Sequence, residues 1–393
     1  MRHATPETAS ARPGEWPVHF LHTSTLIGGG NKVLLRLIDG LSDSPYRPMS
    51  VVPRVGPMTG ELSRRGIPTW HITLNEPASA PVRAMRLLQL HGYLRRHGAA
   101  IVHVNDPITY GFVRRCWPPA ASRWICHIHH PDVDRATLEW AFRQAPEAIL
   151  TPSRYVAGHV ASLVDGPFTG LKDRIVPVMN PIDTVFFTPD PDRQAVSARL
   201  GLDADVHHLV MAGAITAHKG QDLFLDVVEA LRGAGLNVAG HVIGGVQPGS
   251  EAFEASLKAR ASRPGAPLPV TFHGFTSDER VRDLFRLASV FVLPTSEEGF
   301  GLVLAEAGAC GTPVVSTAIK PLDEVVQHGR TGLLVDRAAG ALSEAVRGLL
   351  ADAERRRTMG LAAREWVVGA FSQEAFCDRV RAVYDRVAGR AKR

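Results

Sequence analysis

The sequence has few of the features that mark secreted, membrane-spanning or metal-binding chains. It contains four cysteines in 393 residues, and they stand at neither disulfide nor metal-ligand spacing, which is typical of buried thiols in a reducing cytoplasm. No run of about 18 apolar residues occurs, so the sequence predicts no transmembrane span. Residues 1–15 lack the apolar segment of a secretion signal, and we expect them to form a disordered tail of a cytoplasmic protein.

Strong charge of either sign is also absent. The net charge is +5, and no basic patch interleaved with aromatic residues occurs, so we expect no nucleic-acid partner. The mild positive charge could help to attract a diphosphate substrate or an anionic surface. Peripheral contact with the inner face of a membrane therefore stays open.

Length and patterning indicate two α/β domains. A chain of 393 residues usually divides into two cores, and in both halves short apolar runs alternate with helical patterns, as in βαβ units. The segment Asn180-Pro181-Ile182-Asp183 separates the halves. We predict domains over residues 16–185 and 186–371, and a terminal helix over 372–393.

The same patterns assign individual elements. Apolar runs predict strands over residues 122–130 and 208–212. Helical periodicity predicts helices over residues 32–41, 339–359 and 361–368.

The stretch from Pro294 to Ser316 carries the strongest local signal in the chain. A buried strand is followed by a loop with Gly299 and Gly301 around Phe300, and then by a helix that begins at Leu302. Glycine lets the backbone approach a ligand closely, and the free N–H groups at a helix start suit phosphate or sugar oxygens. The stretch therefore predicts a ligand site.

Two carboxylates, Glu298 and Glu306, flank this loop. If Glu306 lies on the inner face of the helix, both side chains point into one crevice at the carboxyl ends of the strands. An ionised carboxylate can accept hydrogen bonds from vicinal hydroxyls with both oxygens, as sugar binding requires. The alternative is a pair of solvated acids at a helix start, where acidic residues are common.

A glycine turn and a group of histidines stand out in the first half. Gly28, Gly29 and Gly30 lie between the first strand and the first helix, where a Rossmann-like domain brings its backbone close to a ligand. The full dinucleotide fingerprint is missing, and a plain tight turn is the alternative. His129 shares a strand face with His127, whereas His130 would lie opposite.

A metal site is not expected at these histidines. No cysteine or carboxylate partner stands at a zinc-binding spacing. Each ring could instead be a core or capping histidine.

In the second half, Lys219 stands before Gly220 at a strand-to-helix turn. An ammonium group at such a turn is suited to reach the phosphates of a bound nucleotide. Lys219 is therefore a candidate phosphate-binding residue.

The motif Glu298-Gly-Phe-Gly-Leu-Val-Leu-Ala-Glu306-Ala, followed by Gly311-Thr-Pro-Val-Val, resembles the signature of the retaining glycosyltransferases of family 4. The resemblance implies a GT-B fold, which has two Rossmann-like domains facing a central cleft and a C-terminal helix that returns to the N-terminal domain. It also implies transfer of a hexose-type sugar from a nucleotide diphosphate to a hydroxyl acceptor, with retained configuration.

The resemblance also implies roles for particular residues. Catalytic roles fall on Glu298, Lys219 and His129, with His130 as the fallback for the histidine. The donor-binding set comprises the residues Gly28, Gly29, Gly30, Lys219, Phe275, Glu298, Gly299, Phe300, Gly301, Leu302 and Glu306. Phe275 enters through Val270-Thr-Phe-His-Gly274-Phe275, which is similar to the family segment near the nucleotide base. No Asp-x-Asp stands at the strand end expected for the nucleotide, so neither a metal nor a resident cofactor is expected.

The chain departs from the family pattern at three places. Pro181 and Ala214 replace a glycine and an arginine, and Lys320-Pro321 stands where relatives usually have two glycines. His218 or Lys320 could supply the missing cation, although Lys320 could equally be a plain surface lysine.

Three other functions compete with sugar transfer. A catalytically impaired sugar-nucleotide-binding protein would fit Ala214 and the absent glycine pair, and a nucleotide-sugar 2-epimerase would have the same fold. A dehydrogenase using NAD is disfavoured by the incomplete glycine fingerprint. The donor sugar, its base (UDP- or GDP-linked), the acceptor and the oligomeric state do not follow from the sequence.

Overall fold

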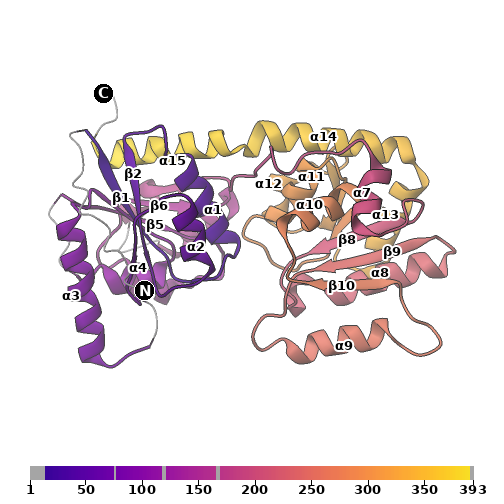
Figure 1. Cartoon of the computed structure of the whole chain (residues 1–393), viewed down its shortest axis with the longest axis horizontal. Helices are drawn as coiled ribbons and strands as arrows, with labels where there is room; N and C mark the ends of the chain where they lie inside the picture. The colour runs from indigo at the N-terminus through magenta and orange to yellow at the C-terminus, as the bar shows by residue number, and fades with distance from the viewer. Residues whose placement is uncertain (1–13, 75–76, 117–120, 165–168, 390–393) are drawn as a thin grey trace. The chain divides into compact units, whose positions relative to one another are not determined.

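The computed structural model describes residues 14–74, 77–116, 121–164 and 169–389. The chain forms two compact units: unit 1 contains residues 1–181 and 373–393, and unit 2 contains residues 182–372 (Figure 1). Of the tail predicted over residues 1–15, only Gly14 and Glu15 lie within the described residues, and β1 begins directly after them at Trp16.

Unit 1 is a doubly wound α/β unit on a parallel sheet of seven strands, in the order β3-β2-β1-β4-β5-β6-β7. The strands are β1 (Trp16–Leu21), β2 (Tyr46–Val52), β3 (Thr69–His71), β4 (Ile101–Val104), β5 (Arg123–His127), β6 (Ala148–Thr151) and β7 (Ile175–Pro177). The helices are α1 (Gly29–Asp39), α2 (Pro57–Arg64), α3 (Ala80–Arg96), α4 (Pro107–Val113), α5 (Arg135–Ala141), α6 (Arg154–Leu163), the 3-10 helix η1 (Thr169–Arg174) and α15 (Gln373–Val387).

The two faces of this sheet have different chemistry. Val102, Val104 and Cys126 belong to an apolar core that includes side chains of α3 to α6. Side chains alternate along a strand, so His103 and His127 point to the other face. There the hydroxyl of Tyr384 in α15 lies 2.7 Å from His103 Nδ1, which ties the C-terminal helix to the sheet of unit 1.

Unit 2 repeats the pattern with a parallel sheet of six strands, in the order β10-β9-β8-β11-β12-β13. The strands are β8 (His207–Ala212), β9 (Val238–Ile243), β10 (Val270–Gly274), β11 (Val290–Leu293), β12 (Val314–Thr317) and β13 (Gly332–Val335). The helices are α7 (Arg193–Leu200), η2 (Ala217–Lys219), α8 (Gln221–Gly233), α9 (Glu251–Ala261), α10 (Asp278–Leu287), α11 (Leu302–Ala309), α12 (Leu322–Val325), α13 (Ala339–Ala351) and α14 (Ala353–Phe371).

The predicted fold class is confirmed, as two doubly wound units with the terminal helix in unit 1. Single elements differ. Helix α1 begins at Gly29 and not at Lys32, because the Gly28 carbonyl already accepts the N–H of Lys32. Strand β5 ends at His127, so His129 and His130 lie beyond it.

The predicted break between the last two helices of unit 2 is also wrong. The chain breaks at Asp352, whose side chain caps α14 by accepting the N–H of Arg355. Gly360 lies inside α14, where a Cβ would come within 2.0 Å of the Gly311 carbonyl oxygen. This glycine thus serves close packing of a helix and does not end one.

Candidate functional site

The strand order of unit 2 reverses between β8 and β11. Chains leaving these two neighbouring strands turn to opposite sides of the sheet, which opens a crevice at their carboxyl ends where α/β proteins bind ligands. The segment after β8 contains Lys219, and the segment after β11 contains Glu298. Two predicted site residues therefore lie at this point.

Lys219 and Glu298 form an ion pair there. The Nζ of Lys219 lies 2.5 Å from Oε1 of Glu298, and the two side chains are 15% and 12% exposed. Because both side chains are mostly buried, their attraction is stronger than that of an ion pair on the surface. An ammonium group has three N–H donors, so Lys219 can hold Glu298 and still donate to another anion.

Two glycines allow this arrangement. Gly220 has φ 78°, and a Cβ on it would come within 2.3 Å of the Pro294 carbonyl oxygen, so the loop after β8 can press against the end of β11. Gly301 has φ 92° at the start of α11. Both backbones adopt the left-handed conformation that favours glycine.

Hydrogen bonds join the same two loops. The carbonyl oxygen of His218 accepts the N–H of Ser296 at 2.8 Å and the hydroxyl of Thr295 at 3.1 Å. Thr295 is fully buried, and its own carbonyl accepts the Thr317 hydroxyl at 2.5 Å. Hydrogen bonds therefore fix the loops that carry the ion pair to the ends of three strands, β8, β11 and β12.

The remaining predicted residues after β11 occupy different settings. Glu306 lies in α11 and is 7% exposed. Phe300 is buried with its ring against Phe371, at 5.3 Å between ring centres, so it can offer a ligand only its backbone. Gly299 is buried, and Leu302 is the first residue of α11, where backbone N–H groups have no partner within the helix.

The departures from the family pattern have clear positions. Ala214 is exposed in the loop after β8. The side chain of Lys320 is 62% exposed and forms an ion pair with Asp323 at the surface. His218 is half-buried, and its Nε2 lies 3.4 Å from the Thr216 hydroxyl.

Sequence reasoning missed one cation at this edge. Arg337 follows β13, and its Nε donates to the Pro294 carbonyl at 3.0 Å. Its place directly after the last strand of the sheet was the available signal.

Phe275 follows β10 at the same edge of the sheet. Its side chain is 88% exposed. The ring lies so close to Gly245 that a Cβ there would come within 2.1 Å of it. An exposed aromatic ring held in this way presents a flat surface to solvent.

Unit 1 has a pocket at its own reversal of strand order, between β1 and β4. The pocket has a volume of about 290 Å³. Gly28 and Gly30 line it together with Asn31, Asn105 and His129. Gly28 precedes α1, and Gly29 and Gly30 are its first residues, so their N–H groups lie at a helix start.

A chain of hydrogen bonds orients His129. Its Nε2 contacts Oδ1 of Asn105, an atom that only accepts, so Nε2 carries the proton. Asn105 Nδ2 donates to Oδ1 of Asn31 at 3.4 Å, and Asn31 Nδ2 donates to the Leu26 carbonyl at 2.6 Å. Asn31 and Asn105 were not predicted, because no local motif marks them.

His129 is a neutral ring with a buried, unpaired acceptor. Burial lowers its pKa to about 4. Within the described residues its Nδ1 has no hydrogen-bond partner. The ring stacks on His127 at 4.1 Å and lies against Gly30, where a Cβ would come within 3.1 Å of it.

His130 has a different setting. Its side chain is 39% exposed, and its Nδ1 lies 3.4 Å from a carboxylate oxygen of Asp132. His130 does not line the pocket of unit 1.

The described residues show neither a metal-binding cluster nor a membrane-spanning helix. No group of three or more His, Cys, Asp or Glu side chains in this part of the chain is arranged to hold a metal ion. No helix within it is both long enough and apolar enough to cross a membrane.

Two family models match consecutive parts of the chain. The model described as Glycosyltransferase Family 4 matches residues 27–186. The model described as Glycosyl transferases group 1 matches residues 192–366. The first match falls mainly in unit 1 and the second entirely in unit 2.

Curated relatives match part of the chain. The D-inositol 3-phosphate glycosyltransferase of Arthrobacter sp. is 37% identical over 184 residues, which are 46% of this chain and 43% of that protein. The alpha-maltose-1-phosphate synthase of Mycolicibacterium smegmatis is 32% identical over 237 residues, 55% of this chain and 58% of that protein. The chain spans about half the length of these relatives.

Solved structures match nearly the whole chain. Anabaena HepE in complex with UDP-glucose has a TM-score of 0.79 at 18% identity, covering 94% of this chain and 99% of that one. Sucrose-phosphate synthase from Thermosynechococcus elongatus has a TM-score of 0.76 at 21% identity, covering 95% and 100%. Together with the two family models, these likenesses show that the chain belongs to the GT-B glycosyltransferases of the family 4 type.

Proposed function

We propose that this protein transfers a hexose-type sugar from a nucleotide diphosphate to a hydroxyl acceptor, without a metal ion and with retained anomeric configuration. The observation that carries the proposal is the ion pair of Lys219 and Glu298 at the reversal of strand order in unit 2. The pair places the Lys219 ammonium, which has further N–H donors, close to the start of α11. A cation and the N–H groups of a helix start are the groups that bind a diphosphate.

In this proposal, unit 2 binds the nucleotide part of the donor. The diphosphate accepts hydrogen bonds from Lys219 and from the N–H groups at Gly301 and Leu302, with the backbone of Gly299 and Phe300 next to them. Glu306 accepts hydrogen bonds from the ribose hydroxyls, and the base lies near Phe275. The family match over residues 192–366 supports this assignment.

The chemistry follows from charge development on the leaving group. As the bond between sugar and phosphate breaks, negative charge grows on the diphosphate, and Lys219 with the helix start stabilises it. Glu298 keeps the ammonium in place and steadies the positive charge that develops on the sugar. The leaving phosphate itself takes the proton of the acceptor, so no dedicated protein base is required.

Unit 1 supplies the sugar and acceptor contacts in this proposal. The neutral His129 lines the pocket and contacts the sugar with its ring, which Asn105 orients through Nε2. Gly28, Gly29 and Gly30 offer backbone N–H groups beside it. The polar residues that line this pocket of about 290 Å³ suit a sugar better than an apolar ligand.

UDP-sugars are the first donors to test, because Anabaena HepE is described with UDP and UDP-glucose. A panel of UDP-, GDP- and ADP-linked sugars is screened by ligand-induced thermal shift, and the binding donors are then assayed for transfer. Retention is read from the configuration of the product by NMR. Full activity in the presence of EDTA is the expected result for a metal-independent enzyme.

The competing functions give different outcomes in the same assays. An impaired binding protein, which the exposed Ala214 favours, would bind a donor in calorimetry yet show neither transfer nor hydrolysis with any acceptor. A 2-epimerase would convert the donor without an acceptor.

Two substitutions separate the roles of the acids. Glu306→Ala should weaken donor affinity, and Glu298→Ala should lower turnover by about 100-fold or more, as for loss of a group that acts on the transition state. Glu254→Ala is the matched control, because Glu254 pairs with Lys258 within α9 at 2.9 Å. Wild-type rates in both site variants would refute the assignment.

A further inference from the structure

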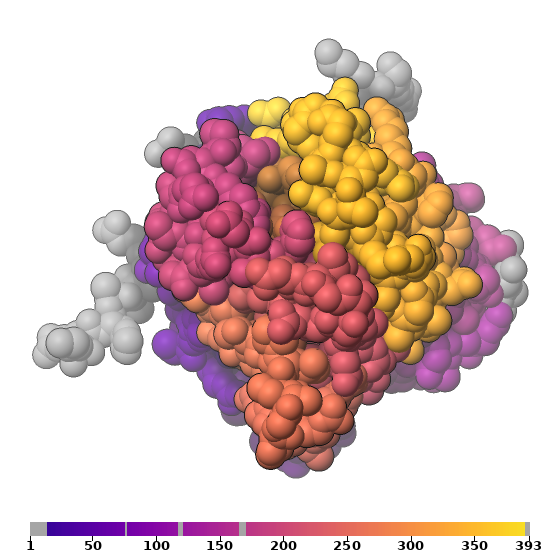
Figure 2. All heavy atoms as spheres, turned by 90° about the vertical axis from the view of Figure 1, so that its right-hand side faces the viewer, coloured from indigo at the N-terminus to yellow at the C-terminus, as the bar shows by residue number. Residues whose placement is uncertain are grey.

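Unit 2 has a second pocket at the opposite edge of its sheet from Lys219. The pocket has a volume of about 280 Å³ and lies where β8, β11 and β12 begin, next to the first turn of α14. Figure 2 shows a hollow on this face between the segment around α7 and the yellow helices that follow α12. The side chains that matter are those of Arg193, Asp205, His207, Ser289, Ala353 and Arg356.

Arg193 is a fixed cation at the wall of this pocket. Its Nε, Nη1 and Nη2 donate to the carbonyls of Ala204 at 3.1 Å, Leu287 at 2.6 Å and Val206 at 3.2 Å. The guanidinium is held by neutral backbone oxygens alone, and within the described residues it has no salt bridge. Its positive charge is therefore held in place without being neutralised.

Arg356 presents an open edge to the same pocket. Its Nη1 donates to the carbonyls of Leu349 at 2.9 Å and Leu350 at 3.2 Å, at the end of α13. In the described part of the chain, Nε and Nη2 have no partner and no carboxylate is close enough for a salt bridge. The edge formed by Nε and Nη2 is the one that binds two oxygens of a carboxylate or phosphate side by side.

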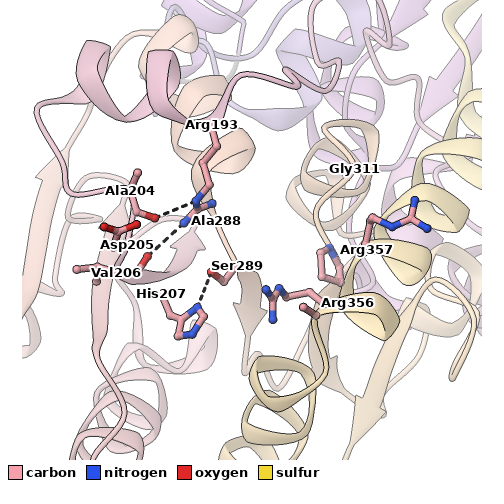
Figure 3. Close-up of a pocket in the computed structure, with 12 residues that line it drawn as sticks. Arg193, Ala204, Asp205, Val206, His207, Ala288, Ser289, Gly311, Arg356 and Arg357 are labelled. Carbon is pink, nitrogen blue, oxygen red and sulfur yellow. Dashed lines mark hydrogen bonds between the residues drawn. The ribbon is translucent and has the colours of Figure 1, made fainter.

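Figure 3 shows how these groups converge. The guanidinium of Arg356 points toward His207 and Ser289, whereas that of Arg357 points away. His207 Nδ1 lies 3.3 Å from the Ser289 hydroxyl. If that hydroxyl donates, His207 Nε2 carries a proton and becomes a further donor to the pocket.

The electrostatics of the pocket favour an anion. Burial and the charge of Arg356 lower the pKa of Arg193, and burial lowers the pKa of Arg356. Burial and the two arginines also lower the pKa of His207. Asp205 raises the pKa of Arg193 and Asp352 raises that of Arg356, so the two carboxylates offset part of the repulsion among the cations, but both arginine pKa values stay lowered.

We propose that this pocket is a binding site for a phosphate dianion, either free phosphate or the phosphate group of a small monoester, held by Arg356 and His207 with Arg193 behind them. The site is separate from the proposed donor site, because the two lie at opposite ends of β8 and β11.

The test is calorimetric titration of the full chain with inorganic phosphate and with glycerol 3-phosphate at constant ionic strength. Ala353→Glu places a carboxylate in the pocket, and because acidic residues are favourable in the first turn of a helix it should not impair folding. We expect phosphate to bind about tenfold more weakly to this variant, or not at all. The two titrants distinguish a site for the free anion from one that prefers a monoester.

Three further variants test whether phosphate binds in this pocket. Ala252→Glu adds the same charge in the first turn of α9 at an exposed position and should bind phosphate like the wild type. Lys219→Gln alters the proposed donor site and should keep phosphate binding in the pocket. Arg356→Gln should lose it.

Two results would overturn the proposal. One is the absence of phosphate binding to the wild-type protein. The other is binding that persists in Ala353→Glu and disappears in Lys219→Gln, which would place the anion at the donor site. Neither result counts against sugar transfer, since the pocket forms no part of the proposed reaction.

Discussion

Mild acid should destabilise unit 1, because His19, His22 and His103 are among its fully buried histidines and are held as neutral rings. Burial lowers the pKa of His19 to about 3, of His22 to about 4 and of His103 to about 3. Their hydrogen-bond partners are neutral groups. The Tyr93 hydroxyl lies 2.8 Å from His19 Nδ1, the Ser50 hydroxyl 3.3 Å from His22 Nε2, and Nδ1 of His127 3.3 Å from His103 Nε2. No carboxylate contributes to these three pKa values.

The sign and size of the effect follow from proton linkage. A histidine whose pKa is lower in the folded state takes up a proton on unfolding, so stability falls as pH drops below the unfolded value of 6.5. The full stability returns above 6.5. At pH 5.5, one unit lower, each histidine costs about 1.4 kcal/mol, and three cost about 4 kcal/mol out of the 5–15 kcal/mol typical of a domain.

Urea unfolding at pH 7.5 and pH 5.5 measures this loss, with hydrogen exchange of amides in β1 and β4 to follow unit 1. His22→Asn keeps a donor near Ser50 and removes one titrating ring. Between pH 7.5 and pH 5.5 this variant should therefore lose about 1.4 kcal/mol less unfolding free energy than the wild type. His71→Asn, at an exposed position of β3, should behave as the wild type. Equal unfolding free energies of the wild type at the two pH values would refute the reasoning.

Two further predictions concern packing, each read from thermal unfolding. Gly360→Ala should destabilise the protein by about 1–3 kcal/mol, because the added Cβ would come within 2.0 Å of the Gly311 carbonyl oxygen; Gly348→Ala, which has nothing within 4 Å, should instead be neutral or stabilising by about 0.5–1 kcal/mol, and equal effects would contradict the packing argument. Tyr384→Phe should cost about 1–3 kcal/mol by leaving His103 without its hydroxyl partner at 2.7 Å, and an unchanged melting temperature would show that this bond contributes nothing.

Strands could be predicted well from the sequence, because buried parallel strands are short apolar runs. The run at residues 208–212 differs by one residue from β8 (His207–Ala212). Helices with little buried surface were harder to predict. Only Leu257 and Ala261 of α9 are buried, so its apolar periodicity is too weak to predict a helix.

Sites were predictable only where one loop carries the whole signal. Glycine turns and acids after β11 could be read locally, but the partner of Glu298 lies 79 residues away. The hydrogen-bonded chain from Asn31 to His129 depends on the order of the strands and has no local motif. The arginine pocket at the amino ends of the strands could not be predicted for the same reason, since its lining residues come from five separate segments.

The most direct test of the central claim is the affinity of Lys219→Gln for the donor that the wild type binds, measured by calorimetry. If Lys219 holds the diphosphate, this affinity should fall by about tenfold or more, as expected for a lost charge-assisted hydrogen bond. Lys258→Gln, which removes a lysine paired with Glu254 on α9, should bind the donor like the wild type. Equal donor affinities in both variants would contradict the account.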